Sequence, residues 1–298
     1  MNKTVCFIVN PVSGTGKWKG IEENIKKYLD PSLTPIIYYT EYPGHATILA
    51  EDATEKCIAI IAVGGDGIVN EVAAGMMGTT ALLGIIPAGS GNALANHFQI
   101  PLDQKEAIEC INKMHSSTVD TALVNGKHFL AVAGTGFDAE VAAMFAGSKR
   151  RGFISYIYLS ALKYLTYKPS EYEITVDGEV FRKKTFVISV ANSSQYGNNA
   201  YISPEASTKD GLLDVSIIKP FSVFSGTIIF WRLFRKTLHH SPYFENIRGK
   251  NILIKRANPD EKLCLHYDGE PGGMVDEIKI SILPKSLKII TPIDHGRI

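Results

Sequence analysis

The sequence is short of net charge and of cysteine. Its 298 residues include 31 Lys and Arg against 30 Asp and Glu, which gives a formal net charge of +1. A broad binding surface for nucleic acid or for an anionic membrane is therefore not expected, although local basic patches remain open. The four cysteines are scattered and form no C-x-x-C pair, so we expect free thiols in a reducing compartment.

Long apolar runs are also missing. No stretch of about 18 apolar residues is uninterrupted, so no segment is predicted to span a membrane. Asn2 and Lys3 lead only into a short apolar run, VCFIV (5–9), which does not fit a secretory signal. Together with the free thiols, these absences lead us to expect a cytoplasmic protein.

Two common nucleotide-binding patterns are absent as well. The form G-x-x-x-x-G-K-[ST] fails because Trp18 follows Lys17 and because Pro11 takes the place of the first glycine. The form G-x-G-x-x-G fails because Lys19 stands where its third glycine belongs. Neither pattern therefore supports nucleotide binding here.

What the sequence does contain is two successive patterns. Its first third alternates helical spacing with buried strand-like runs such as CIAIIAV (57–63) and ALLGIIP (81–87), which predicts a parallel sheet covered on both faces. Farther along, strand-like halves are joined by Asn125-Gly126 and Asp177-Gly178, which are strong hairpin signals.

The predicted fold class follows from this change of pattern. We expect an α/β domain with a doubly wound, mostly parallel sheet over residues 1–120. A larger β-rich domain, antiparallel or sandwich-like, is expected over residues 121–285. The tail 286–298 either adds a last strand there or returns to the first domain.

Three glycine-rich loops follow predicted strands of the first domain: NPVSGTGK (10–17), GGDG (64–67) and PAGSGN (87–92). The carboxyl ends of parallel strands lie at one edge of a sheet, where ligands bind. Glycines let backbone N–H groups approach an anion, and a helix start adds partial positive charge. One such loop is usually only a tight turn, but three at one edge predict a site for a phosphate chain.

Asp66 is a carboxylate inside this predicted anion site. Its charge repels phosphate unless a cation bridges the two or the carboxyl group handles a proton. Two roles stay open: Asp66 binds Mg²⁺, directly or through water, or it orients the attacking hydroxyl. A helix N-cap is the simpler alternative and is compatible with both.

A second pair of carboxylates lies in YDGEP (267–271). Asp268-Gly269 predicts an ordinary hairpin turn. Glu270 is less easily explained by a turn, and Pro271 fixes the backbone beside it. A carboxylate from the second domain that faced the phosphate loops would suit the general base of a phosphoryl transfer.

These pieces belong to a longer series of motifs in the same order along most of the chain. The series is NPVSG (10–14), Thr40 with GHA (44–46), GGDGIVNEV (64–72), PAGSGN (87–92), GTGFDAEV (134–141), KDGLLDV (209–215) and YDGE (267–270). It resembles the diacylglycerol kinase catalytic family of soluble bacterial lipid kinases, sphingosine kinases and ceramide kinases. GGDG alone is less specific, since NAD kinases and phosphofructokinases share it.

The resemblance implies transfer of phosphate from ATP to a lipid hydroxyl, in an NAD kinase/diacylglycerol kinase-like fold with the nucleotide in the cleft between two domains. Glu270 matches the proton acceptor, and Asp66 matches an aspartate of the phosphate and metal network. A structural Mg²⁺ would be held by the Asp210 carboxylate and backbone oxygens at Ser207 and Leu212. The matching nucleotide positions are Asn10, Pro11, Val12, Ser13, Gly14, Thr40, Gly65, Asp66, Gly67, Ile68, Val69, Asn70, Glu71 and Ser90.

One departure bears on the acceptor. The third loop continues as GSGNALAN (89–96), where Ala93 replaces the aspartate of many bacterial members. This loop is more similar to that of sphingosine kinases. The acceptor is therefore left open between diacylglycerol, a sphingoid base and another lipid alcohol.

Two stretches combine apolar and basic residues, 149–165 and 223–240. They predict transient contact with a membrane surface or an acyl chain, and the alternative is amphipathic helices packed on a core. The oligomeric state is not determined by the sequence, and a homodimer stays open.

Two rival functions remain, an NAD-kinase-like enzyme with a soluble acceptor and a non-catalytic nucleotide-binding module on the same scaffold. The second rival is disfavoured because the chain retains Asp66, Asn70, Glu71 and Glu270 together.

Overall fold

A computed structural model describes residues 3–13, 16–148 and 153–292 of the protein. The chain divides into two compact units. The first contains the residues up to Asp120 together with the segment from Pro284, and the second runs from Thr121 to Leu283. The tail, for which the sequence left two alternatives, belongs with the first unit.

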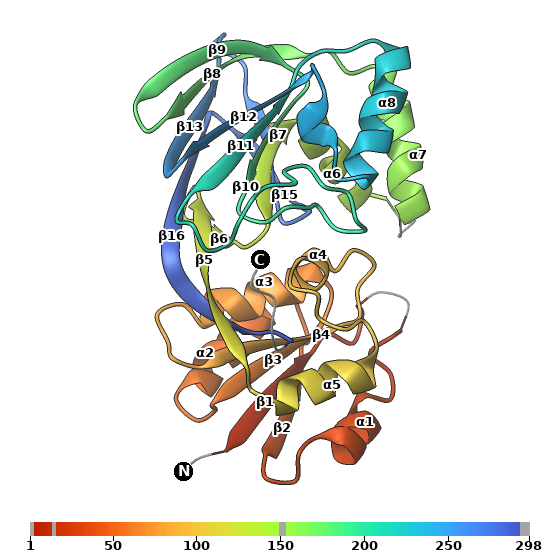
Figure 1. The fold of residues 1–298 in the computed structure, drawn as a ribbon, viewed down its shortest axis with the longest axis vertical. Coiled ribbons are helices and arrows are strands. Elements are labelled where there is room, and N and C mark those ends of the chain that lie inside the picture. Colours follow the sequence, from red (N-terminus) through yellow and green to blue (C-terminus); the bar gives the residue numbers. More distant parts are fainter. Residues whose placement is uncertain (1–2, 14–15, 149–152, 293–298) are drawn as a thin grey trace. The chain divides into compact units, whose positions relative to one another are not determined.

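The first unit is built on a parallel sheet with helices (Figure 1). Its strands are β1 (Thr4–Val9), β2 (Thr34–Tyr39), β3 (Ala59–Gly64) and β4 (Leu82–Pro87), in the spatial order β2-β1-β3-β4. Its helices are α1 (Ile21–Tyr28), α2 (His45–Thr54), α3 (Asp66–Gly75), α4 (Ala93–His97) and α5 (Gln104–Asn112). Ile289 of the late strand β16 (Glu277–Ile290) pairs in parallel with Leu83 of β4.

Strands β1 and β3 are buried on both faces. Phe7 and Ile61 pack in one core with Ile25 of α1. Ile8 and Ile60, which alternate with them along the strands, are also fully buried. A parallel sheet that is covered on both sides requires continuous apolar strands, which explains the unbroken apolar runs of the sequence.

Helix α3 begins at Asp66, inside the glycine-rich loop GGDG (64–67). Asp and Gly have low helix propensity, so the first turn gave little helical signal. The position of α3 depends on a close crossing with α2. A Cβ atom on Gly75 of α3 would lie only 2.4 Å from the carbonyl oxygen of Thr47 in α2, so the crossing requires glycine.

The second unit consists of two antiparallel sheets. One has the order β12-β11-β10-β7-β14-β15, and the other contains β16-β13-β8-β9 with the hairpin β5–β6 paired to β16. The strands are β5 (Ser116–Val124), β6 (Lys127–Phe129), β7 (Val132–Gly136), β8 (Ser170–Val176), β9 (Glu179–Thr185), β10 (Val187–Ala191), β11 (Leu213–Ile218), β12 (Phe244–Gly249), β13 (Asn251–Arg256), β14 (Leu263–Tyr267) and β15 (Glu270–Val275). The helices are α6 (Phe137–Ala146), α7 (Phe153–Tyr164), α8 (Val223–Phe234) and the short 3₁₀ helix η1 (Leu238–His240).

Both sheets of the second unit contribute to one hydrophobic core. Tyr172 and Ile254 from one sheet pack with Ile188 and Leu265 from the other. The predicted fold class is therefore confirmed: a mostly parallel α/β unit is followed by an antiparallel β-rich unit. Among the helices that the structure describes, none combines the length and the apolar content that a membrane span requires.

Candidate functional site

The three glycine-rich loops begin where neighbouring strands of the first unit end. Asn10 follows β1 and donates its backbone N–H to Val63 O of β3 at 3.1 Å. Ala88 follows β4 and donates its N–H to Gly64 O at 2.7 Å. Thr40 follows β2 and donates to Val9 O at 2.9 Å. Because these strands are parallel and adjacent, the predicted site residues after them emerge at one edge of the sheet.

The glycines let two of these loops touch. A Cβ atom on Gly89 would lie 2.4 Å from the Cα of Gly65, which no side chain tolerates. A Cβ atom on Gly64 would lie 2.6 Å from Ile68 Cγ2 and 3.2 Å from Ser13 Oγ. Packing of loop against loop therefore requires these glycines, independently of any phosphate that the loops bind.

The carboxylate of Asp66 joins the second loop to the third. Asp66 is the first residue of α3 and not its N-cap, which is Gly65. Its Oδ1 accepts the backbone N–H of Ala93 at 2.6 Å, and a Cβ atom on Gly91 would lie 3.0 Å from Oδ2. The N-cap alternative is therefore wrong. The negative charge is instead stabilised by a charge-assisted hydrogen bond from another loop and by the start of its own helix.

Asn92 holds the third loop closed. Its Oδ1 accepts the N–H of Gly89 at 3.0 Å, and its Nδ2 donates to the carbonyl oxygen of the same residue at 3.0 Å. Asn92 is buried and has a left-handed backbone with φ 50°. Asn96 adds a bond from Nδ2 to Gly91 O at 3.1 Å. The sequence analysis assigned no role to Asn92, although Asn is the residue that most readily combines this backbone with side-chain bonding.

The remaining predicted nucleotide positions differ in exposure. Ser13, Ile68 and Val69 are buried, whereas Val12 and Ser90 are exposed. Half-buried positions are Asn10, Pro11, Thr40, Gly65, Gly67, Asn70 and Glu71. Gly14 lies outside the described residues.

Glu71 has a structural partner within the same unit. Its Oε2 accepts the N–H of Ala46 at 3.2 Å, near the start of α2, and its carbonyl oxygen accepts from Thr47 Oγ1 at 3.0 Å. The GHA block at residues 44–46 and the GGDGIVNEV block at residues 64–72 are thus connected by these hydrogen bonds.

The predicted structural metal ligands lie in the second unit. Asp210 Oδ1 accepts the N–H of Leu212 at 3.0 Å, and its Oδ2 pairs with the guanidinium group of Arg248. One carboxylate with nearby backbone oxygens is a donor set that suits Mg²⁺. A bound Mg²⁺ ion would, however, have to share Asp210 with Arg248.

Asp214 lies next to this pair and is buried. Its Oδ1 accepts from Asn246 Nδ2 at 2.6 Å and lies 3.6 Å from Arg248 Nε. Burial raises the pKa of Asp214, and the amide and guanidinium groups act against that rise. Within residues 3–13, 16–148 and 153–292, no three His, Cys, Asp or Glu side chains gather closely enough to hold a metal ion.

Glu270 is exposed at the start of β15, directly after a two-residue turn. The turn residues Asp268 and Gly269 have φ angles of 46° and 82°, and Tyr267 pairs with Glu270, so the predicted hairpin is confirmed. Asp268 does more than turn the chain. Its carboxylate accepts three backbone N–H groups at 2.8 to 3.1 Å, those of residues 130–132, which anchors the hairpin that carries Glu270.

Asp138 is the centre of a buried polar cluster that the sequence analysis missed. Its Oδ2 accepts from Ser189 Oγ at 3.0 Å and Tyr196 OH at 2.6 Å, and lies 3.0 Å from His266 Nε2. Burial and the nearby Asp138 charge raise the pKa of Tyr196 well above its usual value. The GTGFDAEV block contains Asp138, but its partners lie 51 to 128 residues away along the chain, so no local pattern indicated them.

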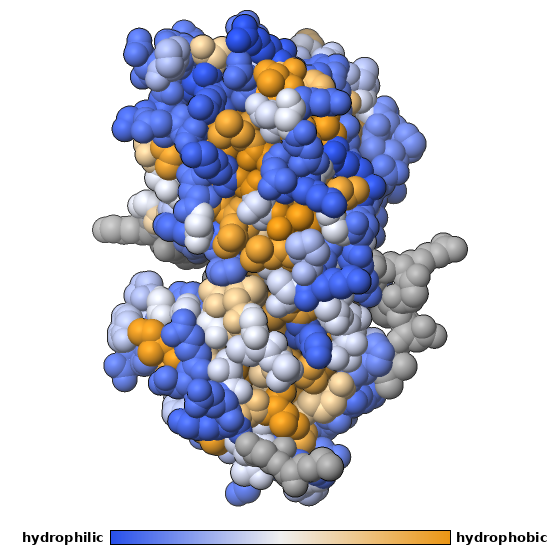
Figure 2. All heavy atoms as spheres, turned by 90° about the vertical axis from the view of Figure 1, so that its left-hand side faces the viewer, coloured by the Kyte–Doolittle hydropathy of each residue, from blue (hydrophilic) through white to orange (hydrophobic). Residues whose placement is uncertain are grey.

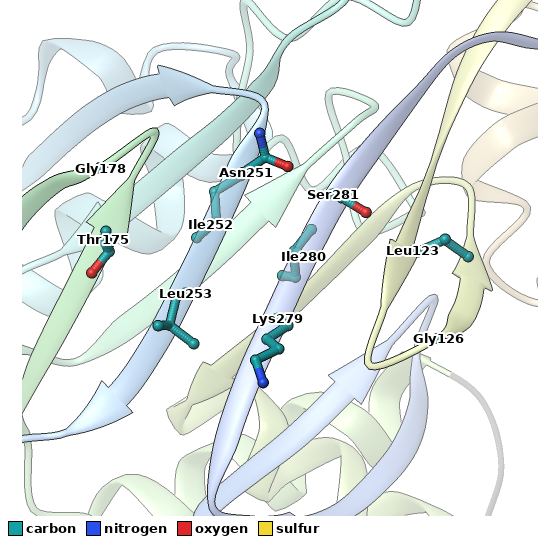
Figure 3. A pocket seen from close by; sticks show the side chains of 10 residues that line it. All are labelled: Leu123, Gly126, Thr175, Gly178, Asn251, Ile252, Leu253, Lys279, Ile280 and Ser281. Atoms are coloured by element: carbon teal, nitrogen blue, oxygen red, sulfur yellow. The ribbon is translucent and has the colours of Figure 1, made fainter.

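A groove of about 400 Å³ lies elsewhere on the second unit (Figure 3). It is lined by Leu123, Gly126, Thr175, Gly178, Asn251, Ile252, Leu253, Lys279, Ile280 and Ser281. Figure 2 views the molecule from the side of Figure 1 on which β13 and β16 are drawn, and apolar side chains are exposed there among hydrophilic ones. None of the predicted site residues lines this groove.

Removal of the Asn92 side chain tests how the third loop is held. We expect Asn92→Gly to lower the free energy of unfolding by about 1–3 kcal/mol, because Gly89 loses both of its partners in a buried place. Asn92→Ala should cost more, since alanine also disfavours the left-handed backbone. Thermal unfolding followed by circular dichroism measures both variants. Equal stability of Asn92→Gly and wild type would contradict the role assigned to the side chain.

Replacement of Arg248 tests the predicted magnesium ligands. Arg248→Met should lower stability by about 1–2 kcal/mol, because Asp210 and Asp214 lose a cation that solvent already partly screens. Millimolar MgCl₂ should then raise the melting temperature of the variant more than that of wild type. Arg182→Met, which breaks the exposed pair with Glu173, is the matched control. A Mg²⁺ effect of equal size in all three proteins would argue against binding at Asp210.

Comparison with known proteins places both units in one family. Residues 4–124 match the family model of the diacylglycerol kinase catalytic domain, and residues 131–291 match that of the YegS C-terminal NAD kinase beta sandwich-like domain. A diacylglycerol kinase of Bacillus subtilis is 30% identical, with 92% of this chain and 91% of that protein covered. A YegS-like probable lipid kinase of Pectobacterium atrosepticum is 27% identical, with 84% and 83% covered.

Solved structures agree with this relationship. A diacylglycerol kinase structure from Bacillus anthracis matches with a TM-score of 0.72 at 22% identity, which supports the fold. Another structure from the same organism matches with a TM-score of 0.78 at 25% identity and covers 98% of each chain. The resemblance inferred from the motifs is confirmed, and the chain belongs to the diacylglycerol kinase catalytic family of lipid kinases.

Proposed function

We propose that the protein transfers phosphate from ATP to the hydroxyl group of a lipid such as diacylglycerol or a sphingoid base. The observation that carries this proposal is the joining of the glycine-rich loops at one sheet edge, with the Asp66 carboxylate between the second loop and the third. Family membership supports the same reaction class.

The proposed ATP site is the loop edge of the first unit. Backbone N–H groups of the loops and the start of α3 attract the phosphate chain, because a helix start carries partial positive charge. Asn92 and the contact between Gly65 and Gly89 hold the loops in place before ATP binds. The loops therefore lose less conformational freedom on binding. Mg²⁺, when bound with ATP, would neutralise charge on the phosphates, and Asp66 is the carboxylate that would hold it.

Glu270 is the proposed acceptor of the hydroxyl proton. Its carboxylate is exposed and therefore open to a substrate, while its backbone is fixed by the turn before it and by Pro271 after it. Asp268 anchors that turn through three backbone N–H groups. A general base on an anchored hairpin loses little conformational freedom when it is positioned to take up the proton.

The choice of acceptor remains wide because of Ala93. Many family members have an aspartate at this position, whereas this chain has an alanine that contacts Asp66 through its backbone N–H and adds no carboxylate. The proposal therefore covers lipid alcohols as a class, with diacylglycerol and a sphingoid base as its first candidates.

Phosphate transfer into lipid tests the proposed function. Incubation with γ-labelled ATP, Mg²⁺ and a total lipid extract should label one or a few lipids, which chromatography and mass spectrometry identify. NAD serves as the soluble acceptor for comparison. Labelled NAD phosphate with unlabelled lipid would overturn the proposal in favour of an NAD-kinase-like enzyme, and ATP binding without transfer would favour a non-catalytic module.

The Glu270→Gln variant tests the proton acceptor. We expect turnover to fall by about 10²–10⁴-fold, because an amide cannot take the hydroxyl proton. Nucleotide affinity, measured by calorimetry, should remain near that of wild type. Glu179→Gln, at another exposed strand start, provides a matched control. Near wild-type turnover of Glu270→Gln on the identified lipid would show that another group accepts the proton.

A further inference from the structure

Helix α8 of the second unit is apolar on the side that faces solvent. Its buried side is marked by Ile229, which is 7% exposed. On the opposite side, Phe224 is 87% exposed, Ile228 57% and Trp231 56%. These three residues follow one another at i, i+4 and i+7, so they form one stripe. Val223 and Phe230 flank the stripe and are also exposed.

Within the part of the chain that the structure describes, the side chains on the outer side of α8 remain exposed. A helix that is hydrophobic all round is normally buried, and soluble monomers rarely expose large contiguous apolar patches unless these bind something. The patch is built into the fold, because Ser222 caps the helix by accepting the N–H of Ser225 at 3.3 Å. The outer face of α8 is defined by Val223, Phe224, Ile228, Phe230 and Trp231, which are all exposed.

Helix α7 carries a second stripe of the same kind. Ile154, Tyr158 and Leu162 recur every four residues and are all exposed, as is Leu165 directly after the helix. The ring of Tyr164, at the end of α7, stacks on that of Phe221, just before α8, with centroids 6.0 Å apart. This contact brings the end of one helix to the start of the other, and Figure 1 shows both on the same unit. An aromatic contact thus joins the two helices that carry these stripes.

Basic groups border the outer face of α8. The guanidinium group of Arg235 lies 5.0 Å from the centroid of the Trp231 ring, and the ammonium group of Lys236 lies 4.4 Å from that of Tyr201. Between positions 219 and 244 the sequence contains four Lys and Arg residues and no Asp or Glu. The surface is therefore apolar with aromatic residues, and the segment of the sequence that carries it is basic.

We propose that α8, with α7 beside its start, docks onto the surface of an anionic phospholipid bilayer. Phe224, Ile228 and Trp231 enter the boundary between headgroups and acyl chains, and Arg235 and Lys236 pair with the headgroup phosphates. Aromatic and aliphatic side chains next to Lys and Arg are what interfacial helices use. A second copy of the chain fits less well, because it would bring the same positive border against itself.

Docking would bring the protein to a lipid acceptor that is held in a bilayer, and in this respect the inference rests on the proposed function. Docking itself is measured without the reaction. If vesicles are bound but no lipid is phosphorylated, the proposed function fails and the docking surface stands. If lipid in detergent micelles is phosphorylated but vesicles are not bound, the docking surface fails and the kinase stands.

Vesicle co-sedimentation is the direct test. Wild type should partition onto vesicles of phosphatidylcholine and phosphatidylglycerol, and increasing salt should weaken this binding several-fold. The double variant Phe224→Ser/Trp231→Ser should bind at least about tenfold more weakly, because it lacks the two aromatic groups that enter the bilayer. Arg235→Gln/Lys236→Gln should lose the preference for phosphatidylglycerol. Leu102→Ser/Val180→Ser removes two apolar residues of comparable exposure elsewhere and should bind as wild type does.

Tryptophan fluorescence supplies a second measurement. In Trp18→Phe, which leaves Trp231 as the only tryptophan, vesicles with brominated acyl chains should quench emission. The serine variants should have the same melting temperature as wild type, which would show that weaker vesicle binding does not come from a loss of folding. Absence of vesicle binding by wild type would overturn the proposal. So would a concentration-dependent dimer that the Phe224→Ser/Trp231→Ser variant abolishes, because the face would then be an interface between copies.

Discussion

The hydrogen bond from the Ala93 backbone N–H to the Asp66 carboxylate is the interaction on which the candidate site depends. It joins the loop after β3 to the loop after β4, and the approach of Gly89 to Gly65 allows no side chain between them. The Ala93 N–H thereby stabilises the negative charge of Asp66 among backbone groups that attract anions. Loop position, helix start and carboxylate orientation are determined together.

Much of this arrangement could be predicted from local sequence. Apolar runs followed by glycine-rich loops fixed the parallel sheet and the edge where the loops meet, because strand direction orders the loop ends. The partners of the carboxylates could not be predicted. Asp66 bonds to a residue 27 positions away, Asp268 to a segment more than 130 positions away, and Asp210 to Arg248 38 positions away. Such pairings depend on register between strands, which no short motif contains.

The carboxylates of Asp268 and Glu270 lie on the same hairpin but have different surroundings. The Asp268 carboxylate accepts hydrogen bonds from three backbone N–H groups and so has a structural role. Glu270, two residues later, has an exposed side chain at the start of β15. The sequence predicted a turn at Asp268 and a candidate base at Glu270, and the structure adds the three backbone N–H groups by which Asp268 anchors the turn.

The long strand β16 has a consequence for synthesis of the protein. Its first part pairs with β13, while Ile289 pairs with Leu83 of β4. Until residue 289 has left the ribosome, β4 exposes an unpaired edge although the loops beside it have long been made. An unpaired edge strand invites pairing with other chains. The edge of β4 therefore gains its last pairing partner only from a segment translated some 200 residues later.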